Sequence, residues 1–498
     1  MNRTIKNYFF LVILISVFSI SCSKNSGDEN ILPENDSKII RELKLKLNST
    51  EDKGVIYIQI GDIFYKNRYY DIALSYYEKS IKYLKLKTSA LERILNYYAQ
   101  NNRYDEFEKK ILEYEDKIAD SDYIGIFLKL SDIYIKKKEL MKNATFMEKM
   151  LRFHPENMEV FYKLLDAYIA LREISQANAM LGKLIKKNIE DPAIIYYQGK
   201  IFEITGEYEK AKNFYTRTIS SHSANGRFEA LAAKGLGIML LNEKKYTEAK
   251  TFFQRASQSN YLKNDDETFY NIGLADYFDF NYGEAIEYFY KSLESNIFNH
   301  NARYYIALIL MNNLKLYKDA SVHLEELLKV YPENTSYLKL LGDCFFILKK
   351  YGDCVDVYKN IIELNPMNSD AEEAFLALGS VYKKMNNTEA ALQEYKAAIN
   401  YFPDNWQFYF NAGNIYDDMN MLDEAVAMFT QSIKCRPELS IIYTNLGNVY
   451  FKKGEYQKAK NSYEYALQLD KNKDAAYNLS VVNDILKKKD DTDSKSNQ

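Results

Sequence analysis

Residues 441–474 read IIYTNLGNVYFKKGEYQKAKNSYEYALQLDKNKD, and this stretch decides the fold. In its first half, Tyr443, Gly447 and Tyr450 recur at intervals of four and three residues, as on one face of an α-helix. A Lys-Gly pair at 453–454 then breaks the pattern, as in a tight turn. In the second half the helical spacing returns at Tyr456, Ala459, Tyr463 and Ala466. The stretch therefore predicts two short amphipathic helices joined by a turn.

The same pattern repeats back along the chain to about residue 54. One position early in each second helix, small in most copies, marks twelve copies, most of them 34 residues apart: Ala73, Phe107, Asn143, Ala177, Ala211, Ala249, Ala285, Ala320, Cys354, Ala391, Ala425 and Ala459. Glycines mark the first helices of eight copies: Gly61, Gly199, Gly237, Gly273, Gly342, Gly379, Gly413 and Gly447. We expect each glycine to face the marker residue of its own copy, so that the two helices approach closely. A Leu at the glycine position would overpack this contact by about 1–3 kcal/mol.

The order of an aromatic residue, Leu-Gly, Tyr, Ala, a second aromatic residue and Pro resembles the tetratricopeptide repeat. The resemblance implies an all-α fold, a right-handed superhelical solenoid of about twelve helical hairpins whose first helices line a concave groove. The repeats span residues 54–470, including a degenerate stretch over 86–157 that keeps the helical pattern but loses most signature residues. Because the ends of a solenoid need a polar outer face, we expect capping helices over 37–53 and 471–489. The charged residues 490–498 predict a disordered tail.

The N-terminus looks like an export signal. Two basic residues precede an apolar run over 8–20, which is too short for a comfortable membrane-spanning helix. Residues 1–21 are therefore predicted to be a signal peptide. The segment also resembles a bacterial lipoprotein signal, which implies that Cys22 becomes a lipidated N-terminus, although Ser19 replaces the usual Leu. Residues 22–36 would then be a flexible tether to the membrane. The alternative is cleavage by the general signal peptidase without lipidation.

Composition and motifs argue against an enzyme and against nucleic acid as a partner. The 66 basic and 69 acidic residues give a net charge of −3, whereas nucleic-acid binding requires a basic surface. The sequence contains no phosphate-binding glycine loop, no HExxH motif and no CxxC motif. Its four histidines are scattered. We therefore expect no catalytic residues, no cofactor and no bound metal.

Two cysteines share one repeat. Cys344 and Cys354 lie on its first and second predicted helices. In an exported protein they could form a disulfide. We favour the simpler interpretation that they are two small buried residues.

Asparagines on the first helices form the strongest candidate site. Asn411, Asn445 and Asn478 lie about one repeat apart, and Asn414 and Asn448 would flank them. An amide side chain is both donor and acceptor, so a row of amides can bind the backbone of an extended peptide. The row resembles the asparagine ladder in the repeats of O-linked N-acetylglucosamine transferases. It fails further upstream, at Leu340 and Ala377, and Asn271 is an isolated match. The alternative is that Asn is simply common at this position.

A second, acidic row lies in the N-terminal half. Asp62, Asp132 and Asp166 fall in register on successive first helices, with Asn96 between the first two. This secondary groove site could attract a basic partner segment. The alternative is ordinary solvation of the groove.

Signal and repeats together resemble bacterial tetratricopeptide lipoproteins that assist pilus or outer-membrane protein assembly. We therefore predict a non-enzymatic scaffold, lipid-anchored in the bacterial cell envelope, that binds proteins or extended peptide segments in its groove. One alternative is a module that recruits substrates for an envelope enzyme or for an assembly machinery. Against the enzyme, no segment outside the repeats is long enough for a catalytic domain. Another alternative is a passive spacer.

Overall fold

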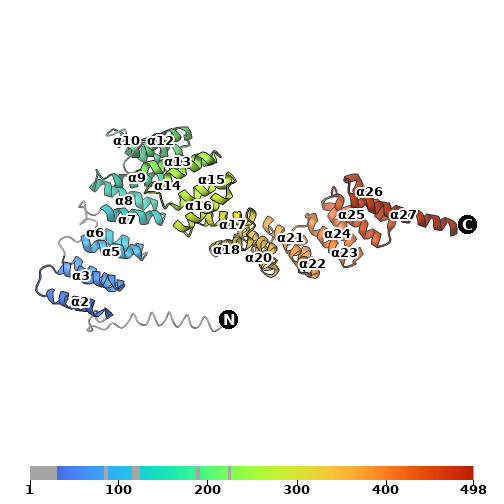
Figure 1. Ribbon diagram of the computed structural model, residues 1–498, viewed down its shortest axis with the longest axis horizontal. Coiled ribbons are helices and arrows are strands. Elements are labelled where there is room, and N and C mark those ends of the chain that lie inside the picture. Colours follow the sequence, from blue (N-terminus) through green and yellow to red (C-terminus); the bar gives the residue numbers. More distant parts are fainter. Residues whose placement is uncertain are drawn as a thin grey trace. The chain divides into compact units, whose positions relative to one another are not determined.

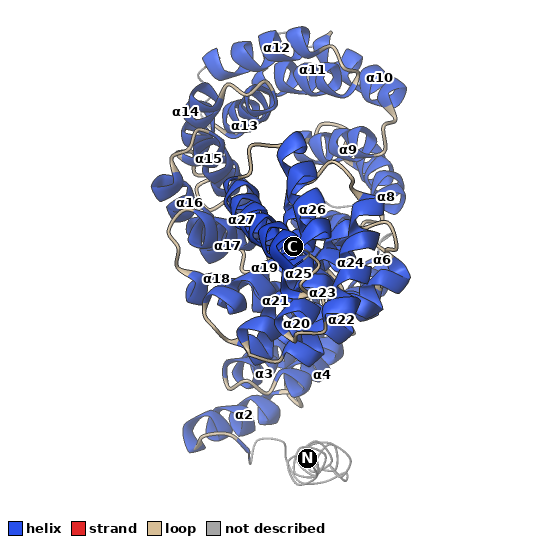
Figure 2. Ribbon diagram, turned by 90° about the vertical axis from the view of Figure 1, so that its right-hand side faces the viewer, coloured by secondary structure: helices blue, strands red, loops and turns tan. Residues whose placement is uncertain are grey.

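The computed structural model describes residues 31–83, 88–101, 103–114, 124–186, 191–221 and 226–496, and these residues form 26 α-helices, α2 to α27, and no β-strand (Figure 1). Figure 2 shows the same all-helical content. The chain divides into two compact units, residues 1–211 and 212–498, with the boundary inside α12. The predicted signal peptide over 1–21 and Cys22 lie outside the described residues.

The helices of unit 1 follow one another as paired segments. They are α2 (Glu34–Lys46), α3 (Lys53–Lys66), α4 (Tyr70–Ile81), α5 (Thr88–Gln100), α6 (Tyr104–Tyr114), α7 (Ile124–Lys136), α8 (Leu140–Phe153), α9 (Met158–Ala170), α10 (Ile174–Ile185) and α11 (Pro192–Ile204). Helix α12 (Tyr208–Ser220) crosses into unit 2. The degenerate stretch over 86–157 is thus helical in its described parts, with α5 to α8 in two hairpins.

Unit 2 continues the pairing. Its helices are α13 (Arg227–Asn242), α14 (Tyr246–Ser257), α15 (Asp266–Phe278), α16 (Tyr282–Ser295), α17 (His300–Asn312), α18 (Tyr317–Leu328), α19 (Thr335–Ile347), α20 (Tyr351–Leu364), α21 (Ser369–Lys384), α22 (Thr388–Tyr401), α23 (Trp406–Asp418), α24 (Leu422–Cys435), α25 (Ser440–Lys452), α26 (Tyr456–Leu469) and α27 (Lys473–Ser496). In Figure 1 successive hairpins of this unit stack side by side. The predicted solenoid is confirmed, with twelve pairs from α3/α4 to α25/α26 and a single helix at each end, equivalent to about thirteen hairpins. Its right-handed twist stays a prediction.

The terminal helices differ from their predicted bounds. Helix α2 begins at Glu34, inside the predicted tether, and ends at Lys46, seven residues before the predicted end at 53. Pro33 precedes its first turn, which is acidic, and its last turn is basic, so the charges complement the helix dipole at both ends. Helix α27 runs to Ser496 instead of ending at 489, because no Gly or Pro interrupts the sequence there.

The glycines allow close contact within the hairpins, and they do so mainly against a residue that we did not expect. A Cβ built on Gly447 would lie 2.5 Å from Cε1 of Tyr463, the aromatic residue four positions beyond Ala459. Seven glycines contact a ring of their own hairpin in this way: Gly61, Gly237, Gly273, Gly342, Gly379, Gly413 and Gly447. The glycine therefore makes room for an aromatic ring as well as for the small marker residue that we expected it to face, since a Cβ on Gly61 would also lie 3.2 Å from Ala73 O and the Cys354 thiol lies 3.3 Å from Gly342 O.

Hairpins without a glycine carry no aromatic ring at the partner position. The four pairs are Leu95 with Ile111, Ser131 with Met147, Leu165 with Leu181, and Ala307 with Leu324. A ring needs the space that a missing Cβ leaves, whereas an unbranched or branched aliphatic chain does not. The two positions thus vary together along the chain.

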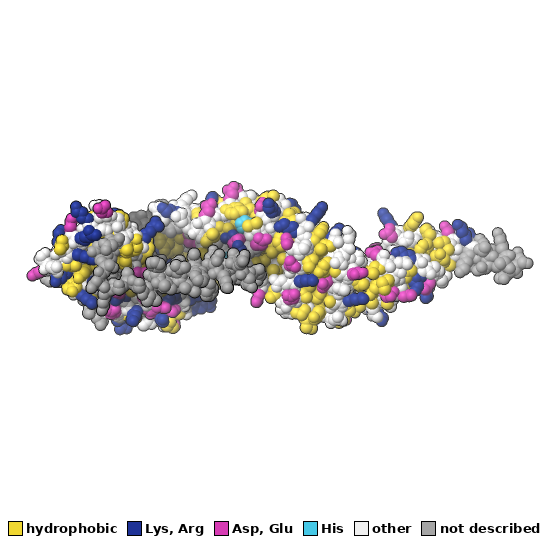
Figure 3. Space-filling model, turned by 90° about the horizontal axis from the view of Figure 1, so that it is seen from below, with side chains coloured by type: hydrophobic (Ala, Val, Ile, Leu, Met, Phe, Trp, Pro, Cys, Tyr) yellow, Lys and Arg dark blue, Asp and Glu magenta, His cyan; other side chains and the backbone are white. Residues whose placement is uncertain are grey.

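The described surface is mixed in charge. Figure 3 shows one face on which basic and acidic side chains are interspersed, in keeping with the net charge of −3. Among the described helices, none combines the length and the apolar character that crossing a membrane requires. Cys344 and Cys354 are buried free thiols, so the predicted simpler interpretation is confirmed.

Candidate functional site

A row of hydrogen bonds joins the first helices of neighbouring repeats at one register. The donor lies two residues before the glycine position of a first helix, and the acceptor lies one residue after the glycine position of the preceding first helix. We call each such bond an inter-repeat rung. Among the described residues, unit 1 has four, Arg93 to Asp62, Lys129 to Asn96, Lys163 to Asp132 and Tyr197 to Asp166. The described part of unit 2 has two, Asn445 to Asn414 and Asn478 to Asn448.

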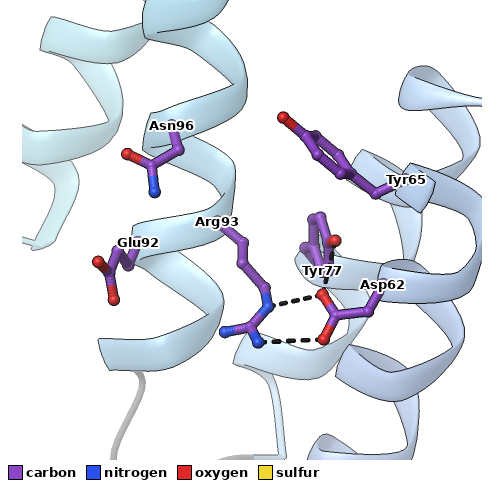
Figure 4. Close-up of a pocket in the computed structure, with 6 residues that line it drawn as sticks. All are labelled: Asp62, Tyr65, Tyr77, Glu92, Arg93 and Asn96. Carbon is purple, nitrogen blue, oxygen red and sulfur yellow. Dashed lines mark hydrogen bonds and ion pairs between the residues drawn. The ribbon is translucent and has the colours of Figure 1, made fainter. Parts of the chain in front are cut away.

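The first rung of unit 1 is an ion pair with two hydrogen bonds (Figure 4). Arg93 Nε donates to Asp62 Oδ1 over 2.7 Å, and Arg93 Nη2 donates to Oδ2 over 3.0 Å. The hydroxyl of Tyr77 also donates to Oδ1, over 2.8 Å. Burial, together with the neighbouring Asp62 carboxylate, raises the pKa of Tyr77. These residues, with Tyr65, Glu92 and Asn96, line a pocket of about 330 Å³. The negative charge of Asp62 is thus already balanced by Arg93 of the same chain.

The rest of the predicted acidic row is paired in the same manner. Asp132 forms an ion pair with Lys163, and Asp166 accepts a hydrogen bond of 3.0 Å from the Tyr197 hydroxyl. Asn96 accepts one of 2.7 Å from Lys129 Nζ. The structure therefore brings the predicted residues into one row, but each carboxylate has an intrachain donor. Two of the three carboxylates, Asp62 and Asp132, are already paired with a basic side chain of this chain. Attraction of a basic partner therefore stays a prediction.

Amide rungs link four of the five predicted asparagines in two pairs. Asn445 Nδ2 donates to Asn414 Oδ1 over 2.8 Å, and Asn478 Nδ2 donates to Asn448 Oδ1 over the same distance. The Tyr463 hydroxyl also donates to Asn448 Oδ1, over 2.8 Å. Asn411 has no hydrogen-bond partner among the described residues and is half-buried. The row is thus contiguous over α23, α25 and α27.

The amide rungs leave hydrogen-bonding capacity unused. An asparagine side chain offers two N–H donors and an oxygen with two acceptor sites. Asn445 uses one donor for its rung, so a second donor and its oxygen remain. Asn478 also uses one donor for its rung, and its side chain has a second hydrogen-bond contact with the Tyr463 hydroxyl. The Asn445 side chain is thus held in place by one hydrogen bond, while its other N–H and its oxygen are available to a ligand.

Between the two sets of rungs, unit 2 has aromatic contacts, which sequence analysis missed. In α15 and α17 the rung positions hold Leu274 and Tyr305. The Tyr305 ring stacks on Phe289 with 5.3 Å between centroids, and it meets Tyr277 edge-on at 4.9 Å. The polar rungs share no single residue pattern in the sequence, because two join opposite charges, two join amides, one joins Lys129 to Asn96 and one joins Tyr197 to Asp166.

The described residues offer little reactive chemistry. They hold no cluster of three or more His, Cys, Asp or Glu side chains that could bind a metal ion. Burial raises the pKa of the Cys344 thiol to about 11 and that of Cys354 to about 12, so both stay protonated at neutral pH. Burial lowers the pKa of His323, whose Nε2 is 3.2 Å from the Tyr290 hydroxyl. The first-helix surface can bind through hydrogen bonds, but it presents no activated nucleophile.

Family models match several parts of the chain. The model described as tetratricopeptide repeat matches residues 440–473, and a second model with that description matches 55–83 and 407–439. A model described as TPR repeat matches residues 379–420. No curated protein matches the whole chain or a part of it significantly.

Solved structures give the same kind of likeness. A tetratricopeptide repeat protein from Parabacteroides merdae is 17% identical over 51% of this chain and 98% of its own, with a TM-score of 0.34. YrrB, described as a TPR protein with an unusual peptide-binding site, is 20% identical over 39% of this chain and 97% of its own, with a TM-score of 0.32. MamA is 24% identical over 31% of this chain and 88% of its own, with a TM-score of 0.29.

Proposed function

We infer that this chain, a protein of the tetratricopeptide repeat family, is a non-enzymatic scaffold that binds extended peptide segments along the first helices of its C-terminal repeats. The observation that carries this proposal is the row of asparagines on α23, α25 and α27. Rungs join Asn445 to Asn414 and Asn478 to Asn448, and Asn411 has no partner among the described residues. A peptide in an extended conformation presents one donor and one acceptor per residue, and an amide side chain matches both.

Within this row the asparagines have two roles. Asn411, Asn445 and Asn478 are the residues proposed to contact the peptide backbone. Asn414 and Asn448 accept the rungs and so fix the orientation of the next amide, which makes them positioning residues. Positioning lowers the entropic cost of binding, since the side chain is already ordered before the peptide arrives.

The test is selection from a random dodecapeptide library on the full chain, followed by affinity measurement on the selected peptides. Replacement of Asn445 and Asn478 by Ala should weaken binding by about tenfold to a hundredfold, since each lost amide pair removes about 1 kcal/mol or more. Asn360→Ala, an exposed amide on α20, is the matched control and should bind as the wild type does. Equal affinities in all variants would refute the site, and failure to select any peptide would refute the function.

We also propose that the mature chain is anchored in the bacterial cell envelope by a fatty acyl group on Cys22. This proposal rests on the sequence of residues 1–22 alone. Metabolic labelling with a palmitate analogue should mark the protein and its Cys435→Ala variant, but not Cys22→Ala. Label that persists in Cys22→Ala would contradict the anchor and leave the peptide site unaffected.

A further inference from the structure

Unit 2 contains a pocket whose lining differs from the asparagine row. It lies between the N-terminal turns of α15 and α17 and the loop that joins α16 to α17, and its volume is about 490 Å³ (Figure 1 locates the helices). Its lining side chains are amides, carboxylates and aromatic rings, with one histidine. Among the described residues that line it, none is aliphatic. An apolar peptide side chain would have few matching contacts here.

One lining residue is a largely buried amide. Asn271 is only 7% exposed and makes no side-chain hydrogen bond with another described residue, but its amide atoms are not among the polar atoms that are cut off from solvent. They can therefore exchange hydrogen bonds with water or with a ligand. Asn271 lines the pocket, so a ligand there can supply a donor and an acceptor.

Two aromatic rings that line the same pocket are exposed to solvent. Phe298 is 73% exposed and Tyr331 is 44% exposed, and the Tyr331 ring is oriented by an edge contact with His300 at 5.3 Å. Exposed ring faces next to hydrogen-bonding groups suit a ligand with one apolar face and polar edges.

The charges of the pocket favour a neutral ligand. Asp266 accepts hydrogen bonds from Asn296 and Asn299, of 3.0 and 3.2 Å, and both end on its Oδ2. Asp266 and Glu267 would repel an anion. The positive ends of the α15 and α17 dipoles, together with Lys234 paired to Glu267 over 2.6 Å, disfavour a free cation.

From these contacts we propose that the pocket between α15 and α17 binds a neutral saccharide. A pyranose ring has an apolar face that stacks on Phe298 or Tyr331. Its hydroxyl groups donate to Asp266 and exchange paired hydrogen bonds with Asn271, as a site built for hydroxyl recognition requires. This inference does not depend on peptide binding at α23 to α27.

A homologous pocket supplies the matched control. It lies between α21 and α23 and is lined by Gln407, the counterpart of Asn301. The counterpart of Asn271 in that repeat is Ala377, so the amide that lines the first pocket is missing there. Gln407→Ala should therefore leave saccharide binding unchanged.

The experiment is calorimetric titration of the full chain with maltotriose, cellotriose and chitotriose, each up to about 10 mM. At least one should bind saturably with a Kd of about 1 mM or tighter, and Asn271→Ala and Phe298→Ala should each weaken it by about tenfold or more. Phe298 is exposed, so its replacement tests the site even if Asn271→Ala unfolds the repeat. No saturation with any of the three, or unchanged affinity in both variants, would overturn the proposal. It would also be overturned if none of them binds while Asn271→Ala weakens a peptide selected on the wild type, because the pocket would then be a peptide subsite.

Discussion

Alanine at two helical glycines should change stability in opposite directions. Gly447 in α25 meets the Tyr463 ring, with an added Cβ 2.5, 2.8 and 3.0 Å from three ring carbons. Gly182 in α10 has nothing within 4 Å of an added Cβ. Both glycines are helical, so Ala gains about 0.5–1 kcal/mol of helix propensity at either site. The sites therefore differ only in what the new methyl group meets.

The magnitude at Gly447 follows from the packing. Carbon atoms prefer about 3.5–4 Å, so the ring would have to move by about 1 Å. Tyr463 is 1% exposed, and its hydroxyl is bonded to Asn448, so such a shift costs about 1–3 kcal/mol in overpacking and about 1 kcal/mol in the hydrogen bond. After the propensity gain is subtracted, Gly447→Ala should destabilise its hairpin by about 1–3 kcal/mol. Gly182→Ala should stabilise its own hairpin by about 0.5–1 kcal/mol.

Backbone hydrogen exchange resolves the two effects, because repeats unfold in segments and a single global midpoint would average them. Amides of α25 and α26 should exchange about tenfold to a hundredfold faster in Gly447→Ala. Amides of α9 and α10 should exchange about threefold more slowly in Gly182→Ala. If Gly447→Ala instead protects its hairpin as Gly182→Ala does, the ring-packing explanation is wrong.

A double-mutant cycle gives a stricter test. The hairpin α17/α18 holds Ala307 and Leu324 at the corresponding positions, and both are buried. Combining Gly447→Ala with Tyr463→Leu should therefore cost less than the sum of the single changes, by about 1–2 kcal/mol. Additive effects would mean that the two positions do not share one space.

Three further outcomes follow from the buried groups. Asn143 is 0% exposed, with both side-chain polar atoms unpaired among the described residues, so Asn143→Ala should stabilise α7/α8 by about 1–2 kcal/mol in urea unfolding; destabilisation would mean that the amide is satisfied. Iodoacetamide at about pH 8 should label Cys435 before Cys344 and Cys354, whose thiol pKa values burial raises to about 11 and 12, and equal rates by peptide mass spectrometry would contradict this. Burial raises the pKa of Tyr463 from 10.0 to about 12, so the contribution of its protonated hydroxyl to folding stability is present below pH 10 and is lost as the pH rises to 12. In Tyr463→Phe the hydrogen-exchange protection of the hairpin should fall less steeply over this pH range. A fall as steep as in the wild type would contradict this assignment.

The helical pairing could be predicted because each hairpin carries its own signals. The spacing of Tyr443, Gly447 and Tyr450 recurs in the best-preserved copies, and the marker position of the second helices carried the count of twelve through the degenerate ones. Bounds were harder at the ends. The start of α2 at Glu34 depends on Pro33, and the extension of α27 to Ser496 depends on the absence of a stop signal, which a charged composition obscured.

The site was predictable only in part. The register of Asn411, Asn445 and Asn478 could be read from the repeat length. Their partners could not, since a rung joins residues 30 to 33 positions apart on different helices. For the same reason Asp62 looked like a free charge in the sequence, although Arg93 neutralises it in the structure.

Closure of a hairpin and contact between repeats use different faces of the same helix. The glycine turns toward the ring of its own second helix, whereas the residue after it turns toward the next first helix. In two repeats the two contacts are coupled, because the rung acceptors Asp62 and Asn448 also accept a hydrogen bond from the hairpin rings Tyr77 and Tyr463. Along this chain the contact between repeats is ionic between α3 and α5 and between α7 and α9, and it joins Lys129 to an amide between α5 and α7. It is aromatic around α15 and α17, and amide from α23 to α27. Salt screens the first kind and barely affects the last. Ligand binding at the amide row should thus be tuned by hydrogen-bond geometry, which explains why a repeat fold can hold distinct sites on one uniform scaffold.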